Sequence, residues 1–378
     1  MHLVRSLKRH FSLSTVPLTN ISAFLNEKSS LPSSFLISEL SESTQKECKE
    51  VAEALHKYGS LAIKDPRSNP SDNHKFLDLM ETYFQTRSKE FYEHRSLEQL
   101  TDCFPELGFE TGVTPEYVEK ARDHSKLMGT LTEENQSQTP TPVPKDAKWR
   151  YMYFIGKDKL NGFDLAPDAH KPKDFEDFEK IFNKWGFTLL NATEIVAEMA
   201  SLGLGFKSDF FTEKLAGGQH LLAPTGSDLK KHPKGTVFAS FHYDFNFLTI
   251  HGRSRYPGLY VWLRDGTKIP VVMPEDYLLL QSGRQFEILT GGYVQCGFHE
   301  VIYSQATANR YAENISLKGE DQWRVSSTLF SHIRHDVMLE PKAHFQTKET
   351  IEKYVPLTSY DLLIEELTAI NLLSKEHQ

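Results

Sequence analysis

Five side chains of this 378-residue chain have the types and the spacing of a metal-dependent catalytic site: His242, Asp244, His299, Arg324 and Ser326. Two imidazoles and one carboxylate hold iron(II) on one face and leave the other face open for oxygen and a substrate. An arginine followed two positions later by a serine offers a planar fork of N–H donors and a hydroxyl to a carboxylate. The two histidines and the aspartate therefore predict oxygen chemistry at a non-haem iron centre.

The segment around the first two ligands alternates in character. Between Phe241 and Phe247, aromatic side chains alternate with metal-binding or polar ones. Residues i and i+2 of a strand project from the same face, so His242 and Asp244 would reach one cation together, whereas a helix would set them about 200° apart. The alternation predicts a strand over residues 241–247. Taken alone, a histidine two residues from an aspartate is weak evidence for a metal site, because this pattern most often marks a hydrogen-bonded pair or a solvated face.

Two downstream segments must position the remaining residues. His299 lies in a short β-prone segment after a Thr-Gly-Gly turn, so we expect a second strand to deliver its imidazole. Residues 323–330 alternate again, which places Arg324, Ser326 and Thr328 on one face. This face predicts a clamp for the distal carboxylate of a keto acid. The alternative is that Arg324 is a surface arginine in an ion pair.

These pieces, in their order and approximate spacing, resemble the isopenicillin N synthase-like superfamily of iron(II)/2-oxoglutarate-dependent dioxygenases. The matching pieces are the segment from His242 onward, Pro257–Trp262, Pro274, Leu280–Gly283, Leu289–Gly292, His299–Val301 and Arg324–Ser326. Towards the N-terminus, Val16–Ile21 resembles the opening strand of the family and Tyr58–Ile63 the strand after its first helix. The resemblance is therefore most specific in the C-terminal part of the chain.

The resemblance implies that His242, Asp244 and His299 bind Fe(II) and that Arg324 and Ser326 bind 2-oxoglutarate. It further implies that 2-oxoglutarate and O2 are cosubstrates, that a small organic substrate is hydroxylated or desaturated, and that succinate and CO2 are released. Two alternatives stay open. One is an oxidase of the same superfamily that works without 2-oxoglutarate and holds its substrate's own carboxylate with the Arg-x-Ser pair. The other is a non-catalytic jelly-roll protein that binds a metal or a small ligand.

The chain departs from the family pattern at two places. The segment between His299 and Arg324 is longer than the family usually has, and Arg310 lies nearer the usual offset. We expect Arg324 to be the clamp, because Arg310 is followed two positions later by Ala312 and not by a serine. An aromatic Asn-x-Tyr element that often touches 2-oxoglutarate is replaced by residues 219–225.

We expect the fold to be mainly β, a double-stranded β-helix (a cupin-like jelly roll) with flanking helices. The expected parts are 1–15 as a basic arm or presequence, 16–148 as an N-terminal helical region, 149–340 as the jelly-roll core with a backing helix, and 341–378 as a C-terminal helical segment. Helical patterns cover residues 43–57, 72–92, 174–204 with a break near Gly186, and 360–373. Residues 130–148 are expected to form a loop that either covers the site or is a solvated insertion.

Composition argues against two classes of partner. The formal charge of −8 and the pI near 6.1 argue against nucleic acid or an anionic membrane as the main partner, and no segment is long and apolar enough to span a bilayer. The cysteines, Cys48, Cys103 and Cys296, form no CxxC and fit a reducing compartment such as the cytoplasm. Residues 1–15 are basic and free of acidic groups, so a mitochondrial presequence is the alternative. Nothing here predicts the oligomeric state.

The substrate itself is not specified by the sequence. The segment from Trp149 to Tyr153 is a candidate wall of the substrate pocket. Arg150 in that segment would meet an anionic substrate, and the alternative is that it forms an ordinary ion pair within the protein.

Overall fold

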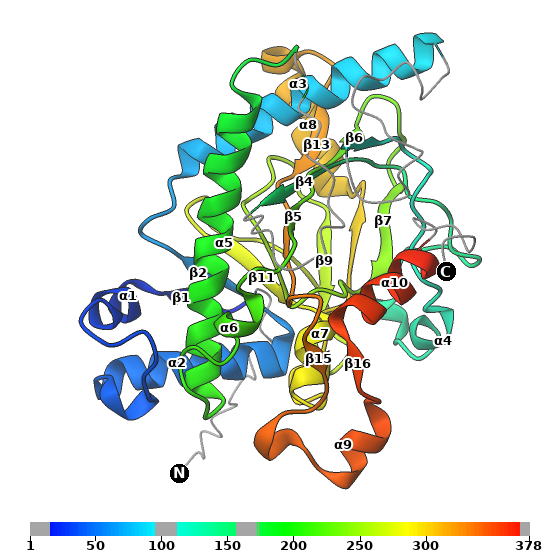
Figure 1. The fold of residues 1–378 in the computed structure, drawn as a ribbon. Coiled ribbons are helices and arrows are strands. Elements are labelled where there is room, and N and C mark those ends of the chain that lie inside the picture. Colours follow the sequence, from blue (N-terminus) through cyan, green and yellow to red (C-terminus); the bar gives the residue numbers. More distant parts are fainter. Residues whose placement is uncertain (1–15, 95–111, 156–171, 173, 371–378) are drawn as a thin grey trace, which may run out of the picture.

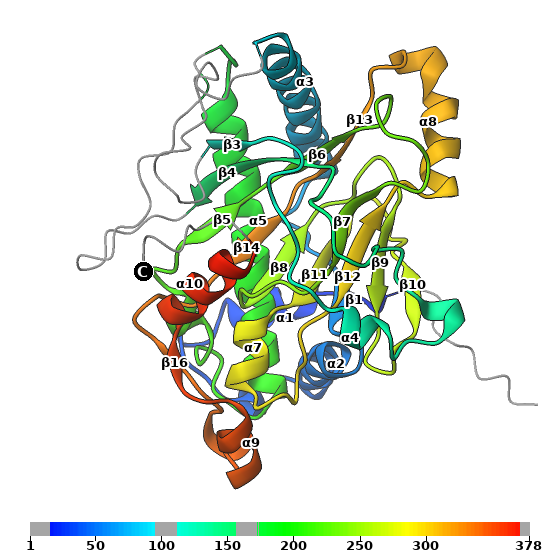
Figure 2. The same cartoon turned by 90° about the vertical axis from the view of Figure 1, so that its right-hand side faces the viewer.

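The computed structural model describes residues 16–94, 112–155, 172 and 174–370. Ten of the described strands form a large, mainly antiparallel sheet, and four form a smaller antiparallel one. One cavity is lined from both sheets and contains all five predicted site residues, so the sheets face each other across the site. Figures 1 and 2 show this core with helices around it. The predicted jelly-roll architecture is confirmed.

The large sheet runs, in spatial order, β1 (Leu18–Asn20), β2 (Ser60–Lys64), β11 (Leu278–Ser282), β8 (Leu248–His251), β14 (Leu329–Ser331), β5 (His220–Leu222), β4 (Trp149–Ile155), β6 (Thr225–Asp228) and β13 (Trp323–Ser326), with β3 (Gly112–Thr114) also pairing β4. The small sheet runs β10 (Lys268–Pro270), β9 (Leu259–Trp262), β12 (His299–Ile302) and β7 (Val237–His242). A separate pair joins β15 (Met338–Leu339) to β16 (Leu357–Thr358). Because β1 pairs with β2 and β2 pairs with β11, the N-terminal part of the chain belongs to the large sheet.

The described helices lie around these sheets. They are α1 (Ser22–Lys28), α2 (Glu42–Tyr58), α3 (Pro70–His94), α4 (Ser125–Met128), α5 (Phe178–Gly203), α6 (Thr212–Leu215), α7 (Arg284–Leu289), α8 (Gln305–Lys318), α9 (Lys348–Lys353) and α10 (Ser359–Ala369). Three short 3-10 turns complete the set, at Ile37–Glu39, Glu133–Asn135 and Ala343–Phe345.

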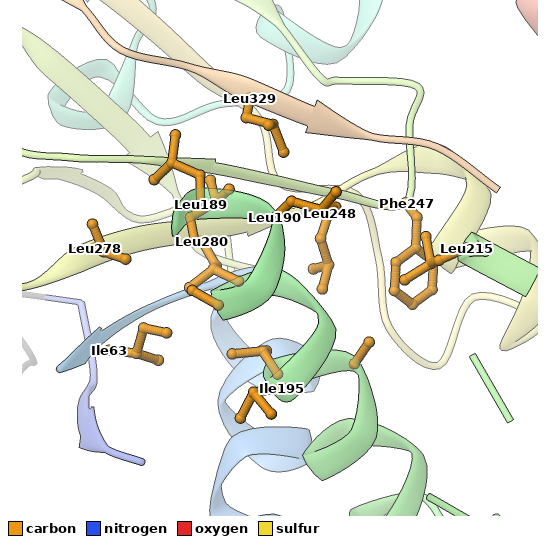
Figure 3. Close-up of a cluster of buried hydrophobic side chains, with 14 of the residues drawn as sticks. Ile63, Leu189, Leu190, Ile195, Leu215, Phe247, Leu248, Leu278, Leu280 and Leu329 are labelled. Atoms are coloured by element: carbon orange, nitrogen blue, oxygen red, sulfur yellow. The ribbon is translucent and has the colours of Figure 1, made fainter. Parts of the chain in front are cut away.

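The main hydrophobic core lies between α5 and the large sheet. Figure 3 shows leucines of α5 against apolar side chains of β2, β8, β11 and β14. Leu189 of α5, Leu248 of β8, Leu280 of β11 and Leu329 of β14 are all completely buried. Burying one such side chain contributes about 1.5–3 kcal/mol, so this layer holds in place the large sheet, which carries Arg324 and Ser326.

The helices predicted over residues 43–57 and 72–92 are confirmed as α2 and α3. The Ser41 hydroxyl accepts the backbone N–H of Thr44 at the start of α2, and Gly59 ends the helix with φ +63°. That left-handed conformation favours glycine, which explains why the helix stops there and β2 begins. The helix predicted over 360–373 is present as α10, whose predicted last residues lie outside the described part of the chain.

The predicted break near Gly186 is wrong, because α5 continues through it from Phe178 to Gly203. A Cβ built on Gly186 would lie 2.5 Å from the Cδ1 of Ile155 on β4. The glycine therefore serves close packing of helix against sheet, and apolar burial along α5 outweighs its low helix propensity.

The loop predicted over residues 130–148 is confirmed, apart from the turn at Glu133–Asn135. The Ser137 hydroxyl and the Gln138 backbone N–H both donate to the buried carboxylate of Glu300 on β12. Since Glu300 alternates with His299 along the strand, this part of the loop lies on the outer face of the small sheet. At its C-terminal end, Lys148 of the same loop lines the cavity that contains the predicted site residues.

Three sequence predictions lie outside the described residues: the basic N-terminal arm, Cys103 and the last turn of the C-terminal helix. Cys48 is buried and Cys296 is half-buried, and both are free thiols. Among the described residues, no helix is long and apolar enough to cross a membrane.

Candidate metal centre

Strand pairing in the small sheet brings the two histidines together. His242 ends β7 and His299 begins β12, and the two residues are direct register partners in the antiparallel pair. Their ring centroids are 4.2 Å apart. The expectation that a second strand delivers the His299 imidazole is therefore confirmed.

The strand predicted over residues 241–247 is wrong in its extent, because β7 stops at His242 and Asp244 lies in the loop that follows. Carbonyl groups of this loop accept hydrogen bonds from the start of α7, and the Phe247 N–H donates to the Ser331 carbonyl of β14. The carbonyl of Asp244 accepts the Arg284 N–H at 2.9 Å, and the carbonyl of Phe247 accepts the Gly283 N–H at 3.0 Å. The first N–H groups of a helix have no partner inside the helix, so they are free to bind such carbonyls.

Gly283 is required for this close approach. A Cβ at this position would lie 2.0 Å from the backbone oxygen of Asn246. A larger residue would therefore push the Asp244 loop away from α7 and move the carboxylate.

The three predicted ligands converge on one point. The Nε2 atom of His242 lies 3.7 Å from Oδ1 of Asp244, and the Nε2 atom of His299 lies 3.8 Å from Oδ2. One ligand atom from each residue can be chosen so that all three lie within 4.8 Å of one another. In the described part of the chain, these residues form the one such cluster of histidine, cysteine and acidic groups.

Backbone contacts set the tautomer of both imidazoles. The Nδ1 atom of His242 lies 2.5 Å from the carbonyl of Ser240, and that of His299 lies 3.1 Å from the carbonyl of Gly297. A carbonyl can only accept, so each Nδ1 carries a proton, and the neutral form of each ring has its lone pair on Nε2. Burial, and then the neighbouring His299 and Lys148, hold the pKa of His242 well below its usual value. Both rings are thus prepared to bind a cation through Nε2.

Thr249 on β8 orients the carboxylate. Its hydroxyl lies 2.6 Å from Oδ2 of Asp244 and 3.1 Å from Oδ1 of Asn246, and its side chain is buried. Sequence reasoning missed this residue. A signal was present, since Thr249 is a hydroxyl residue between the apolar Leu248 and Ile250, which face the core.

The donor set fits a divalent iron ion. Two neutral imidazole nitrogens and one carboxylate supply three ligands on one side, so that other positions remain available for exchangeable ligands. A hydrogen-bonded outer shell of the kind made by Ser240, Gly297 and Thr249 is typical of metal sites.

A cavity of about 200 Å³ adjoins the three ligands on the side of β13. Arg324 of β13 lines it, is 6% exposed, and donates from Nε to the Pro257 carbonyl at 3.1 Å. Among the described residues, no carboxylate forms an ion pair with this guanidinium, and burial lowers the pKa of Arg324 to about 10. Ser326 and Thr328 line the same cavity, and their hydroxyl oxygens are 2.7 Å apart.

Arg310, the rival to Arg324, belongs to α8, the helix formed by the long segment after β12. It also lines the cavity, but its side chain is half-exposed, and its Nε lies 3.6 Å from the carboxylate of Glu313. Ala223 and Thr225 line the cavity where the family pattern has its aromatic Asn-x-Tyr element. The two arginines therefore reach one cavity and differ in burial and in pairing.

A second cavity, of about 80 Å³, adjoins the ligands on another side. It shares Lys148, Arg150, His242, Asp244 and Phe330 with the first cavity and continues towards Glu366 of α10. Arg150 of β4 is paired with Glu119, with Nε–Oε1 and Nη2–Oε2 distances of 2.7 and 2.9 Å. The internal ion pair, which was the alternative to an anion-binding role for Arg150, is thus present.

No model of a protein family matches the chain. A curated relative, the mugineic-acid 3-dioxygenase of Hordeum vulgare, is 25% identical over 156 residues, which are 41% of this chain and 41% of the relative. The chain therefore matches less than half the length of this relative.

Solved structures match over most of the chain. A full-length protein of Neurospora crassa, solved in complex with alpha-KG, has a TM-score of 0.67 at 16% identity and covers 94% of this chain and 97% of its own. A 2OG-Fe(II) oxygenase family protein from Caulobacter crescentus has a TM-score of 0.66 at 18% identity and covers 87% of this chain and 96% of its own. The chain has the fold of these proteins.

Proposed function

We propose that the chain is an Fe(II)- and 2-oxoglutarate-dependent oxygenase that hydroxylates or desaturates a small organic substrate. The observation that carries this proposal is a buried arginine, Arg324, without a carboxylate partner among the described residues, in the cavity that also contains a His-Asp-His cluster. Burying an unpaired cation is costly, so the site is suited to a ligand that brings a negative charge. The alpha-KG complex of the fungal structure and the dioxygenase name of the barley relative support the proposal.

We assign iron binding to His242, Asp244 and His299. Their lone pairs and carboxylate lie on one side of a common point, and Thr249 holds the carboxylate in orientation. The single carboxylate leaves net positive charge on a bound Fe(II), which favours an anionic second ligand such as the keto-acid end of 2-oxoglutarate.

We assign the distal carboxylate of 2-oxoglutarate to Arg324 and Ser326. The Arg324 Nε is held by Pro257, which fixes the guanidinium plane and leaves the two terminal nitrogens to donate side by side. The Ser326 hydroxyl, in contact with Thr328, adds a donor at the same end of the cavity. This arrangement orients the cosubstrate so that its keto acid reaches the three ligands.

Bound iron would supply the activation of oxygen that couples oxidation of a C–H bond to decarboxylation of the keto acid. For hydroxylation, one 2-oxoglutarate, one O2 and one C–H bond give succinate, CO2 and one C–OH group. The chain holds the reactants in place, and the buried part of the lining around Asp244, His299 and Arg324 is suited to exclude water.

The test is anaerobic titration of the protein with Fe(II) and then with 2-oxoglutarate. We expect a visible charge-transfer band that saturates at one equivalent of each, and succinate release when oxygen is admitted. Asp244→Ala serves as a control without the carboxylate ligand. Iron binding without a band or succinate would reject the role of 2-oxoglutarate, and turnover of a substrate without succinate would indicate the 2-oxoglutarate-independent oxidase.

We also propose that the protein works in a reducing compartment such as the cytoplasm. Two observations support this: Cys48 and Cys296 are free thiols, and the three cysteines form no CxxC. Imaging of the tagged full-length chain in intact cells would test this, with mitochondrial targeting by residues 1–15 as the rival outcome.

A further inference from the structure

The charges deep in the second cavity neutralise one another. The Lys148 ammonium lies 2.9 Å from the Asp146 carboxylate and 3.1 Å from that of Glu119, which also pairs with Arg150. Three of these side chains are 7% exposed or less, and Arg150 is 14% exposed. Two cations and two anions thus form a closed, neutral network beside the metal ligands.

The side of the cavity formed by α10 is neutral in the same way. Arg122 lies 3.1 Å from the carboxylate of Glu366, which also accepts the hydroxyl of Tyr243 at 3.1 Å. Apart from the candidate metal ligands, Lys120 is the one charged residue of this lining that forms no ion pair among the described residues. Its side chain is partly exposed to water.

The imidazoles in the lining are uncharged near neutral pH. Burial, together with the nearby Arg122, lowers the pKa of His124 to about 4. Burial and the neighbouring His220 hold the pKa of His332 well below its usual value. Neither ring therefore offers a positive charge to a ligand.

The lining offers uncharged hydrogen-bonding groups and aromatic surface. Asn246 is 1% exposed, and its Nδ2 has no hydrogen-bond partner among the described residues, whereas its Oδ1 faces Thr249. Phe245 and Phe330 add aromatic walls, and the Arg150 guanidinium lies over the Phe330 ring. A ligand here meets imidazole and aromatic groups, with the buried Asn246 amide directly behind them.

We propose that the substrate group bound in this cavity is uncharged, and that it is recognised through amide, carbonyl or hydroxyl hydrogen bonds. The inference rests on the proposed function, which places 2-oxoglutarate against Arg324 and Ser326 in the first cavity and so leaves the second cavity for the substrate. A carboxylate here would compete with Glu119 for Arg150, and an ammonium would compete with Lys148 and Arg150 for Glu119. Either would strand a buried charge of the network, whereas an uncharged group leaves every pair intact.

The test uses ligands that share an aromatic ring and carry an uncharged, an anionic or a cationic group of similar size: benzamide, benzoate and benzylamine, and a second pair, nicotinamide and nicotinate. Each is titrated by calorimetry into the protein loaded with Mn(II) and 2-oxoglutarate, without oxygen. We expect each amide to bind at least tenfold more tightly than its charged counterparts. Equal or tighter binding of a carboxylate or the amine, or no binding by either amide, would overturn the proposal.

Glu119→Gln provides a second, opposite expectation. It removes the carboxylate that neutralises Arg150, so benzoate should gain at least tenfold in affinity while benzamide changes little. The double variant Glu119→Gln/Lys148→Met keeps the network neutral and should keep the preference for benzamide. Unchanged benzoate affinity in a folded Glu119→Gln protein would contradict the inference, and if the variant does not fold, the wild-type comparison decides alone.

Failure of this inference is distinguishable from failure of the proposed function. Binding of Mn(II) and of 2-oxoglutarate is measured in the same samples before any probe is added. Absence of that binding rejects the proposed function, whereas normal cosubstrate binding with a preference for carboxylates rejects the uncharged substrate alone.

Discussion

At the scale of single residues, the candidate centre depends on three side chains that hydrogen bonds already hold in one orientation. Each imidazole donates from Nδ1 to a backbone carbonyl, and Asp244 accepts from Thr249. Such a site has little freedom to compensate for a lost ligand.

We therefore expect His242→Ala, Asp244→Ala and His299→Ala each to lose most iron affinity and all turnover while keeping the fold. Removal of one of three ligands destroys both the charge balance and the geometry of the site. Metal content after gel filtration, succinate release and circular dichroism measure the three properties. Near-normal iron content and activity in any of the variants would show that the ligand assignment is wrong.

Thr249 is expected to act through Asp244. Thr249→Val keeps the shape of the buried side chain but removes the hydroxyl that donates to Oδ2. Loss of such an outer-shell contact typically weakens metal binding about 10- to 100-fold. Competition with a chelator measures this, and Thr249→Ser should restore most of the affinity. If valine binds iron as tightly as threonine does, the hydroxyl has no orienting role.

The cosubstrate clamp distinguishes Arg324 from Arg310. Loss of a buried, charge-assisted contact costs about 2–5 kcal/mol, and loss of an exposed one costs under about 1 kcal/mol. Arg324→Ala should thus raise the 2-oxoglutarate dissociation constant well over tenfold, with Ser326→Ala milder and Arg310→Ala nearly silent. Anaerobic titration of each iron-loaded variant decides, and a large loss confined to Arg310→Ala would reverse the assignment.

At the scale of elements, close packing of α2 against α5 supports the sheet behind the site. A Cβ on Gly203 of α5 would lie 2.2 Å from the backbone oxygen of Cys48 in α2. Gly186 likewise allows close packing where α5 crosses β4. This packing explains why the helix contains a glycine although glycine weakens a helix locally.

Gly203→Ala should therefore destabilise the protein by about 1–3 kcal/mol, the usual cost of overpacking. Helix propensity alone would favour alanine by about 1 kcal/mol, so the sign of the change tests the packing. Gly129→Ala is the control, because its nearest neighbour would be 3.4 Å away. Urea unfolding measures both, and a stabilised Gly203→Ala protein would show that the two helices can separate without cost.

At the scale of the whole molecule, the protein buries several neutral histidines. Burial, partly offset by a hydrogen bond to the Leu215 carbonyl, lowers the pKa of His220 to about 4. Burial likewise lowers the pKa of His251 to about 4. In the unfolded chain a histidine has a pKa of about 6.5, so between the two values only the unfolded state holds the proton.

Stability should therefore fall as the pH falls from about 6.5 to 4, by up to about 3 kcal/mol for one such histidine. Urea unfolding of the metal-free protein at pH 7, 6 and 5 measures this without the separate effect of metal release. His220→Gln should make the dependence shallower. An identical dependence in that variant would mean that His220 does not contribute to it.

The sequence by itself determined the types and the spacing of the candidate ligands and the β-rich core. These follow from local periodicity and donor chemistry, which a few neighbouring residues specify. Sequence reasoning placed Asp244 on a strand and a break at Gly186, and both were wrong for one reason. The partners that decide them, Arg284 for the Asp244 loop and Ile155 for Gly186, are distant in the chain.

Only the tertiary structure decided what the charged residues do. Arg150 and Arg324 are both arginines on strands beside the same cavity, yet Glu119 neutralises the first and, among the described residues, no carboxylate neutralises the second. The register of β7 against β12, which places His242 opposite His299, likewise depends on contacts distant in sequence. Local patterns specify which groups are available for chemistry, whereas long-range packing determines which of those groups are already paired, because pairing requires partners that the folded chain alone brings together.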